Sequence, residues 1–272
     1  MAEATSFAPP TALRPVLRVG PGGADWVMDE VATEMPLTLY VNNVEVATLV
    51  ATPTDLEDLV YGFMVSEGIV ANPQAVRLVE IDAEAQTARV LADADVSLAA
   101  QKMFERRYIA SCCGKGRASI YFASDASALE PITGGPTLTA EAALALVQHL
   151  QGESDIFRRT GGVHNVALAH PDGSLVAARA DIGRHNALDK LYGHCLQQGI
   201  HTSDLVCVLS GRVSSEMLLK AAKLRVAIVV TKAAPTELAL ALAEEVGVTV
   251  VGFARGERIN VYTHAERILV AR

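Results

Sequence analysis

The segment SCCGKGR, residues 111–117, places two cysteines side by side, next to glycines and two cations. A thiol acts as a nucleophile only in its thiolate form, which Lys115 and Arg117 would favour next to Cys113. The glycines let the loop bend and let a partner molecule approach. We therefore expect a thiolate that takes up sulfur as a persulfide or exchanges with a disulfide. Cys113 is the expected nucleophile, with Cys112 as its helper or as a second carrier.

A structural disulfide between Cys112 and Cys113 is unfavourable. Neighbouring Cα atoms lie ~3.8 Å apart across a trans peptide, whereas disulfides join Cα atoms ~4.4–6.8 Å apart. A pair of inert buried thiols is the competing interpretation, and the polarity of the loop disfavours it. Cys195 and Cys207 lie in a helical and a strand-like pattern, where free cysteine usually behaves as a small buried hydrophobe.

A second group of chemically capable residues follows the apolar strands of the C-terminal half. The polar segments are DIGRHN, SGR, TK and GFARGER, and their cations are Arg184, Arg212, Lys232, Arg255 and Arg258, with His185 beside the first. In open α/β sheets, ligands bind at the carboxyl edge of the strands, where helix N-termini attract anions. A single arginine at a strand end is more often a solvated or locally paired charge. Cations or glycines after four consecutive strands favour an anion site.

The familiar nucleotide and metal motifs are missing. The chain contains no GxxxxGK[ST] and no GxGxxG following a strand. The order of elements resembles the zinc deaminase fold, but the HxE and PCxxC strings that hold zinc there do not occur. We therefore expect no metal ligands.

Two parts must position these residues. Residues 1–135 are expected to form a smaller α+β part. It begins with an irregular lead-in over about 1–30, with short strands possible near its end. A hairpin around Asn42 and Asn43, a helix ending near Gly68, a further strand pair and the cysteine loop follow. PITGGPT, residues 131–137, is the best candidate linker. Residues 136–272 alternate helices with apolar strands. This pattern predicts a mostly parallel sheet with helices on both faces, the first helix capped by Thr139.

Composition limits the possible partners and compartments. The chain has 272 residues, and its formal net charge of −8 argues against general binding of nucleic acid or of an anionic membrane. No apolar run approaches the ~18 residues of a membrane span. No secretory signal is visible at the N-terminus. We expect a cytoplasmic protein with reduced thiols.

The chain resembles the formate dehydrogenase accessory sulfurtransferases, the FdhD family, from about Glu34 to Ile268. The resemblance is carried by EMPLTLYVNN, ATPTDLEDLVYGFMVSEGI, SCCGK, TGGVHNVAL, DIGRHNALDKLYG, SGRVSSEMLLKAAK and APTELALALAEEVGVTVVGFARGERINVYTHAERI. DIGRHNALDK and SGRVSSE together are highly specific. The resemblance implies a cytidine-deaminase-like mixed α/β domain without zinc, preceded by the smaller N-terminal part, in a homodimer.

The resemblance also implies a function. Such proteins accept sulfur from a cysteine desulfurase as a cysteine persulfide. They pass it to the molybdenum bis(molybdopterin guanine dinucleotide) that formate dehydrogenase requires, and a GDP-like nucleotide would mimic that substrate. The family's cofactor-binding stretch maps onto Phe253, Ala254, Arg255, Gly256, Glu257 and Arg258, to which the strand-end residues Arg184, His185 and Arg212 add. Many relatives carry C-x-x-C where this chain has CC, which leaves open which cysteine is the carrier.

Two other functions remain compatible with the residues. A cofactor-binding chaperone would hold and insert the cofactor without covalent sulfur chemistry, so it would not need the thiols of Cys112 and Cys113. A thiol oxidoreductase would need a reversible bridge between these two cysteines, which the geometry disfavours.

Overall fold

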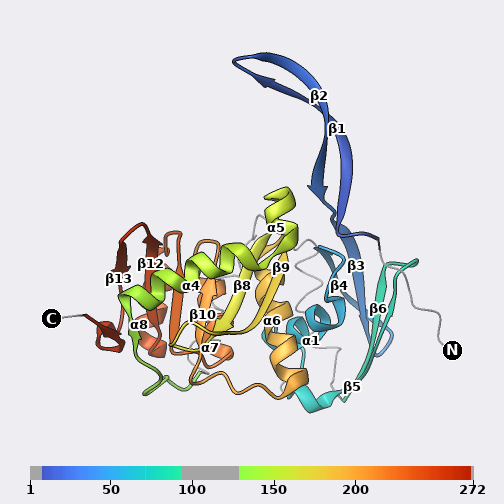
Figure 1. Cartoon of the computed structure of the whole chain (residues 1–272). Coiled ribbons are helices and arrows are strands. Elements are labelled where there is room, and N and C mark those ends of the chain that lie inside the picture. Colours follow the sequence, from blue (N-terminus) through green and yellow to red (C-terminus); the bar gives the residue numbers. More distant parts are fainter. Residues whose placement is uncertain (1–7, 71, 94–128, 271–272) are drawn as a thin grey trace.

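The computed structural model describes residues 8–70, 72–93 and 129–270, and the cysteine loop 111–117 lies outside these ranges. The described chain is a mixed α/β structure with six α-helices and four separate β-sheets. Figure 1 shows a large sheet with helices at the C-terminal end of the chain, a smaller sheet beside it, and a long hairpin projecting from the body. The mixed α/β class is thus confirmed, and the cytidine-deaminase-like topology stays a prediction.

The projecting hairpin corrects the expected irregular lead-in. β1 (Thr11–Gly20) and β2 (Gly23–Ala32) pair antiparallel over ten residues each. The prolines and glycines that suggested irregular chain mark instead the tight turn at 20–23 and the entry to the hairpin. Odd positions of β1 and even positions of β2 share one face, and that face is apolar. Its large side chains are between 48% and 72% exposed, namely Leu13, Leu17, Val19, Trp26 and Met28.

The hairpin is attached to the body at its base. Arg159 Nε donates to Glu30 Oε2 at 2.8 Å, and Arg159 Nη2 donates to Thr11 Oγ1 at 3.3 Å. Arg159 belongs to the short helix α5 (Asp155–Thr160), which packs against β2. The base of the hairpin is thereby fixed to the C-terminal half of the chain, while its outer part extends into solvent.

The smaller sheet has the order β4-β3-β6-β5. Its strands are β3 (Met35–Val41), β4 (Val44–Ala51), β5 (Val76–Asp82) and β6 (Thr87–Ala92), with a 3-10 turn at Pro73–Ala75. Asn42 and Asn43 both have positive φ, at 48° and 65°, so the predicted hairpin turn is confirmed. Helix α1 (Leu56–Ser66) covers the sheet, and Leu37, Leu39 and Leu59 lie in their common core.

The larger sheet has the order β13-β12-β11-β10-β8-β9. Its strands are β8 (His164–Ala169), β9 (Leu175–Asp181), β10 (Val206–Leu209), β11 (Ile228–Thr231), β12 (Thr249–Arg255) and β13 (Arg258–Val261). Only β10–β11 and β11–β12 are parallel. The expectation of a mostly parallel sheet was therefore wrong, because the hairpins β8–β9 and β12–β13 add antiparallel pairs at both sides.

Helices cover both faces of the larger sheet, as predicted. α4 (Ala140–Glu153) packs across β8, β10, β11 and β12. On the other face α6 (Arg184–Gln198) packs against β8 and β9, α8 (Glu237–Val246) packs against β12, and α7 (Ser215–Lys223) contacts both helices (Figure 1). Every residue of β10 and β11 is buried, as expected for strands covered on both faces.

The segment predicted as a linker is irregular but tightly packed. Gly134 and Gly135 have positive φ, at 89° and 106°, and a Cβ at Gly135 would lie 2.3 Å from Ala227 Cβ. Arg267 donates to the carbonyls of Gly134 and Ile132. Arg267 belongs to a 3-10 turn (Ala265–Arg267) before β14 (Ile268–Leu269), which pairs with β7 (Leu138–Thr139). The segment is thus part of the packed C-terminal body.

The N-terminal and C-terminal parts meet where α1 crosses α6. A Cβ at Gly62 would lie 1.8 Å from the carbonyl oxygen of Asp189, and a Cβ at Gly193 would lie 1.8 Å from that of Asp58. Only glycine allows two helix backbones to approach this closely. Each part nevertheless has its own buried hydrophobic cluster. The division into residues 1–135 and 136–272 stays a prediction.

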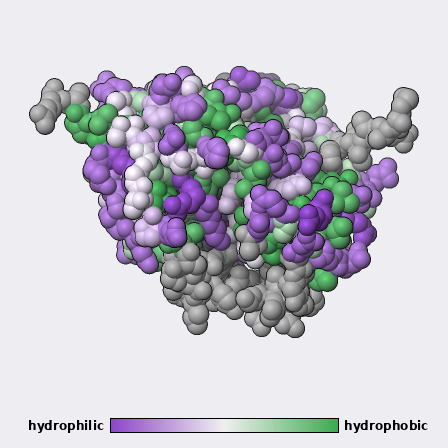
Figure 2. All heavy atoms as spheres, turned by 90° about the horizontal axis from the view of Figure 1, so that it is seen from below, coloured by the Kyte–Doolittle hydropathy of each residue, from purple (hydrophilic) through white to green (hydrophobic). Residues whose placement is uncertain are grey.

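The described helices include none that is both long enough and apolar enough to cross a membrane. On the face shown in Figure 2, hydrophilic residues cover most of the described surface and hydrophobic residues form separate small groups.

Candidate functional site

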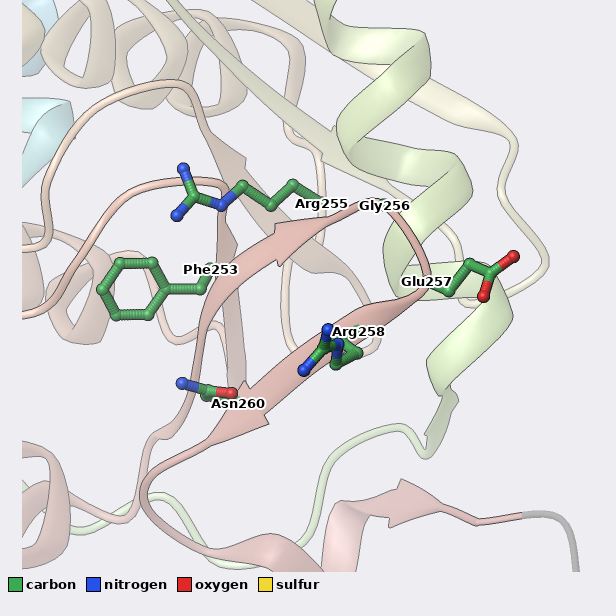
Figure 3. Close-up of a pocket in the computed structure, with 6 residues that line it drawn as sticks. All are labelled: Phe253, Arg255, Gly256, Glu257, Arg258 and Asn260. Atoms are coloured by element: carbon green, nitrogen blue, oxygen red, sulfur yellow. The ribbon is translucent and has the colours of Figure 1, made fainter.

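A pocket of about 570 Å³ lies where β12 turns back into β13. Its lining consists of five residues predicted from the sequence and one that was not, namely Phe253, Arg255, Gly256, Glu257, Arg258 and Asn260. Figure 3 shows Phe253 and Arg255 extending to the same side of the two strands, while Glu257 points away from them. The volume lies within the range of small-ligand sites.

Phe253 has an unusual backbone that shapes this pocket. Its φ is 51°, a left-handed value that a bulky residue rarely adopts, and the β12–β13 register shifts between Gly252 and Arg255. The Arg255 guanidinium carbon lies 5.5 Å from the Phe253 ring centroid, within cation–π distance. The bulge thus places an aromatic face and a cation together at an open site, where a planar base or an anionic group could bind.

Two neighbouring residues differ from the expected pattern. Ala254 is 1% exposed, so only its backbone is available to a ligand. Asn260 reaches the pocket from β13, and its Nδ2 donates to Tyr262 Oη at 3.3 Å. Asn260 was missed because it lies on the return strand, two residues beyond the quoted motif. Its strand pairing with Gly252 could have indicated it only once the hairpin register was known.

The remaining predicted cations lie farther along the same sheet edge. Arg184 is the first residue of α6, and its Nε is buried without a hydrogen-bond acceptor among the described residues. His185 Nε2 lies 3.1 Å from Glu216 Oε2. Arg212 is exposed in the loop between β10 and α7. None of the three lines the pocket at β12–β13, so the structure separates the predicted cationic edge into two groups.

Several residues of the DIGRHNALDK motif make buried contacts that stabilise the fold rather than bind a ligand. Asp181 is fully buried and accepts from Thr52 N at 2.9 Å and Gly183 N at 2.8 Å. Lys190 Nζ lies 2.7 Å from Asp181 Oδ2 and donates to the carbonyl of Thr52 at 3.0 Å. Asn186 Nδ2 donates to the carbonyl of Val50 at 2.8 Å. These bonds join the start of α6 to the segment that follows β4.

A second buried pair lies in the SGRVSSEMLLKAAK motif. Lys220 Nζ contacts Asp189 Oδ2 at 2.6 Å and Glu67 Oε1 at 3.0 Å, and it donates to Ser66 Oγ at 3.1 Å. Burial opposes the charge on Lys220, but the two carboxylates outweigh it, so the pKa of Lys220 is raised. This lysine joins α7 to both α1 and α6, and it is not available to a ligand.

The cysteines fall into two classes. Cys112 and Cys113 lie outside the described residues, so their roles stay predictions. Cys195 and Cys207 are buried, and burial raises the pKa of the Cys195 thiol to about 11 and that of Cys207 to about 12. Their interpretation as inert core residues is confirmed. Among the described residues, no three His, Cys, Asp or Glu side chains converge in an arrangement that could hold a metal ion.

Fold and site together define a mixed α/β protein with an arginine-lined pocket at one edge of its larger sheet. The model of the FdhD/NarQ family matches residues 32–269, and the chain belongs to this family. It is 48% identical over 257 residues to the sulfur carrier protein FdhD of Geobacillus kaustophilus, a match that covers 94% of this chain and 97% of the relative.

Two further similarities cover almost the whole chain. The sulfur carrier protein FdhD of Bacillus subtilis is 46% identical over 258 residues, covering 95% of this chain and 97% of the relative. A crystal structure named "putative formate dehydrogenase accessory protein", from Desulfotalea psychrophila, aligns with a TM-score of 0.79 at 26% identity. That alignment covers 96% of this chain and 100% of the other. The family resemblance stated from the motifs is therefore confirmed.

Proposed function

We propose that this protein is a sulfur carrier for formate dehydrogenase. It accepts sulfur from a cysteine desulfurase as a persulfide and transfers it to molybdenum bis(molybdopterin guanine dinucleotide), which is its substrate. The name shared by its relatives, sulfur carrier protein FdhD, supports the carrier role. The observation that carries the proposal is the pocket of Phe253, Arg255 and Arg258, which is suited to a nucleotide-bearing substrate.

The sulfur chemistry is assigned to the cysteine pair. The thiolate of Cys113 attacks the terminal sulfur of the desulfurase persulfide, and the desulfurase cysteine leaves as its own thiolate. The sulfur then resides on Cys113 until it is delivered. Cys195 and Cys207 do not compete, because burial raises the pKa of both thiols well above neutral pH.

The pocket at β12–β13 is assigned to the guanine nucleotide portion of the substrate. A planar base stacks on the exposed side of Phe253, and Arg255 and Arg258 attract the phosphates. Among the described residues, neither arginine forms an ion pair with a carboxylate, so both charges are available. GDP is the simplest probe for this part of the site.

The first experiment tests covalent sulfur transfer. The purified protein is incubated with a cysteine desulfurase and cysteine, and its intact mass is measured. We expect the addition of one sulfur, located on Cys113 by peptide mapping and absent from Cys113→Ala. A cofactor-binding chaperone would instead restore formate dehydrogenase activity after Cys112→Ala and Cys113→Ala were combined, and that result would overturn the carrier proposal.

The second experiment separates loading from delivery. We expect Cys113→Ala to retain GDP affinity in calorimetry while losing sulfur transfer. We expect Arg255→Ala and Arg258→Ala to accept sulfur normally yet fail to activate the dehydrogenase, because both residues line the pocket. Arginine variants that cannot be persulfurated would show that loading and delivery are not separate, and the two-site proposal would have to be abandoned.

We also propose a cytoplasmic homodimer in which the hairpin β1–β2 contacts a second copy. Isolated two-stranded hairpins are only marginally stable in water, and this one exposes an apolar face that includes Trp26 and Met28. Its other face is electrically balanced, with Arg18 Nη2 3.4 Å from Asp29 Oδ1. A neutral, apolar surface is suited to self-association of a chain whose net charge is −8.

Light scattering tests the dimer. Replacing Trp26 and Met28 together with serine should convert the dimer to a monomer. The matched control is Leu238→Ser in α8, another exposed apolar side chain, which should leave the mass unchanged. A monomeric wild type, or an unchanged dimer in the double variant, would contradict this arrangement.

A further inference from the structure

His164 occupies a polar niche that the motif analysis did not assign to the site. It begins β8, next to the end of β10. Ser210 Oγ accepts the amide hydrogen of Asn165 at 2.9 Å and lies 3.4 Å from His164 Nδ1. The hydroxyl of Ser210 can donate to Nδ1 in the tautomer that carries the imidazole proton on Nε2. In this tautomer the ring presents an N–H donor at the sheet edge.

Burial and the neighbouring cations favour the neutral form of His164. Burial lowers the pKa of His164, and the nearby charge of Arg184 lowers it further, with smaller contributions in the same direction from His185 and Lys232. Asp181 acts in the opposite direction. However, the carboxylate of Asp181 is already bound by Lys190 and by two backbone amides, so it leaves the cationic surroundings largely uncompensated.

The two cations of this niche have no acidic partners among the described residues. Arg184 forms no ion pair there, and its buried Nε has no acceptor. Lys232 Nζ contacts only the Phe157 ring, at 5.8 Å from the centroid. The buried lysines Lys190 and Lys220, in contrast, each contact a carboxylate. Arg184 and Lys232 are only partly buried, but the Arg184 Nε atom itself is buried, and burying a polar atom without a partner is costly. The arrangement therefore indicates a place for an external anion.

The niche and the pocket at β12–β13 are separate but lie along the same edge of the larger sheet. A Cβ at Gly211 would lie 3.2 Å from His164 Nδ1 and 3.7 Å from Arg184 Cδ, so the three residues are in contact. Thr231 Oγ1 donates to the carbonyl of Gly211 at 2.7 Å. Phe253 N donates in turn to the carbonyl of Ala233 at 3.0 Å. From β12 to β10 and β8 there are two and three strand spacings, roughly 10–14 Å, a span that an extended nucleotide covers.

We propose that His164, Arg184 and Lys232 form a second binding site, specific for a phosphate-type oxyanion, beside the pocket of Phe253 and Arg255. Arg184 supplies directed N–H donors, Lys232 supplies a point charge, and His164 supplies one neutral donor. The proposal that this phosphate belongs to a nucleotide rests on the proposed function. The inference of an oxyanion site does not, because it is drawn from the positions of Arg184 and Lys232 and from their lack of acidic partners among the described residues.

Calorimetry with inorganic pyrophosphate tests the site. We expect wild-type protein to bind pyrophosphate, with affinity falling about tenfold in Arg184→Gln and in Lys232→Gln, and falling with added salt. Arg18→Gln, which removes an exposed arginine of the hairpin, is the matched control and should change nothing. Thermal melting curves establish that each variant is folded. Absence of wild-type binding, or equal losses in the control, would overturn the proposal.

Two further measurements separate this inference from the proposed function. Guanosine binding should be unchanged in Arg184→Gln but weakened in Phe253→Leu, whereas GDP binding should be weakened in both. If the wild-type protein bound pyrophosphate but neither guanosine nor GDP, the nucleotide pocket would be refuted and the oxyanion site would stand. By proton NMR, pyrophosphate should raise the pKa of His164, because a nearby anion favours imidazolium. An unchanged His164 titration would exclude this residue from the site.

Discussion

Lys190 and Asp181 form an ion pair in which neither side chain has any exposed surface, with Nζ 2.7 Å from Oδ2. The pair lies where the N-terminal part meets the C-terminal body, because Thr52 contacts both residues. The remaining hydrogen bonds of the pair are made to backbone groups and to the side chains of Asn186 and Thr54. Removing either partner would leave the other charge buried without compensation, which is among the costliest single changes in a protein.

Lys190→Met should therefore lower the free energy of unfolding by about 3–5 kcal/mol. Urea denaturation of the whole chain measures this change. The matched control is Arg18→Gln, which breaks the exposed pair between Arg18 and Asp29 and should cost less than about 1 kcal/mol. If Lys190→Met lowered the free energy of unfolding no more than the control does, the buried pair would not stabilise the contact between the two parts.

The close crossing of α1 and α6 gives a second stability prediction. Gly62→Ala and Gly193→Ala each place a Cβ 1.8 Å from a carbonyl oxygen of the other helix, so the helices must separate. We expect a loss of at least 1–3 kcal/mol, roughly the cost of overpacking. Gly152→Ala, in α4 with nothing within 4 Å, should instead stabilise the protein by up to about 1 kcal/mol. A gain in stability in all three variants would show that helix propensity, not contact, governs the effect.

Alkylation should distinguish the two classes of cysteine. At pH 8, iodoacetamide should modify neither Cys195 nor Cys207 in the native protein, because burial excludes the reagent and raises the pKa of both thiols. Peptide mapping by mass spectrometry identifies the modified residues, and urea-unfolded protein provides the control in which all four cysteines react. Native labelling of Cys207 would contradict its position in the core.

The lowered pKa of His164 makes stability depend on pH in a defined direction. The unfolded chain binds the imidazole proton more readily than the folded chain, so stability is lost as pH falls from about 6.5 through the folded-state pKa. Compared with wild type, His164→Gln should lose less stability between pH 7.5 and pH 5. Urea denaturation at both pH values measures the difference. An identical pH dependence would show that His164 does not titrate as inferred.

Local signals in the sequence predicted many individual elements correctly. Thr139 caps α4, accepting from Ala142 N at 3.1 Å, and Asn42-Asn43 forms the turn between β3 and β4. Arg255 and Arg258 of the GFARGER segment line a pocket, while their role in binding stays a prediction. These features depend on neighbours within a few residues, so a linear pattern carries enough information to indicate them.

Features that depend on long-range pairing could not be predicted in the same way. The niche of His164 exists because β8 runs antiparallel to both β9 and β10, which brings its first residue to the edge where those strands end. Asp181 was read as part of an anion-binding motif, yet its carboxylate is bound by Lys190, nine residues later, and by Thr52. In the hairpin β1–β2, the glycines of the turn obscured the alternation of apolar and polar residues.

The left-handed backbone conformation of Phe253 has a cost in stability, but it belongs to the bulge that shapes the pocket. A non-glycine residue in a sparsely populated conformation costs of order 1–3 kcal/mol. Glycine would remove this strain, but it would also remove the ring beside Arg255. Engineering that selects only for thermostability would therefore favour glycine in place of Phe253, and the pocket would lose its aromatic ring. An aromatic side chain that is retained at this position despite its cost would indicate selection for ligand binding rather than for folding.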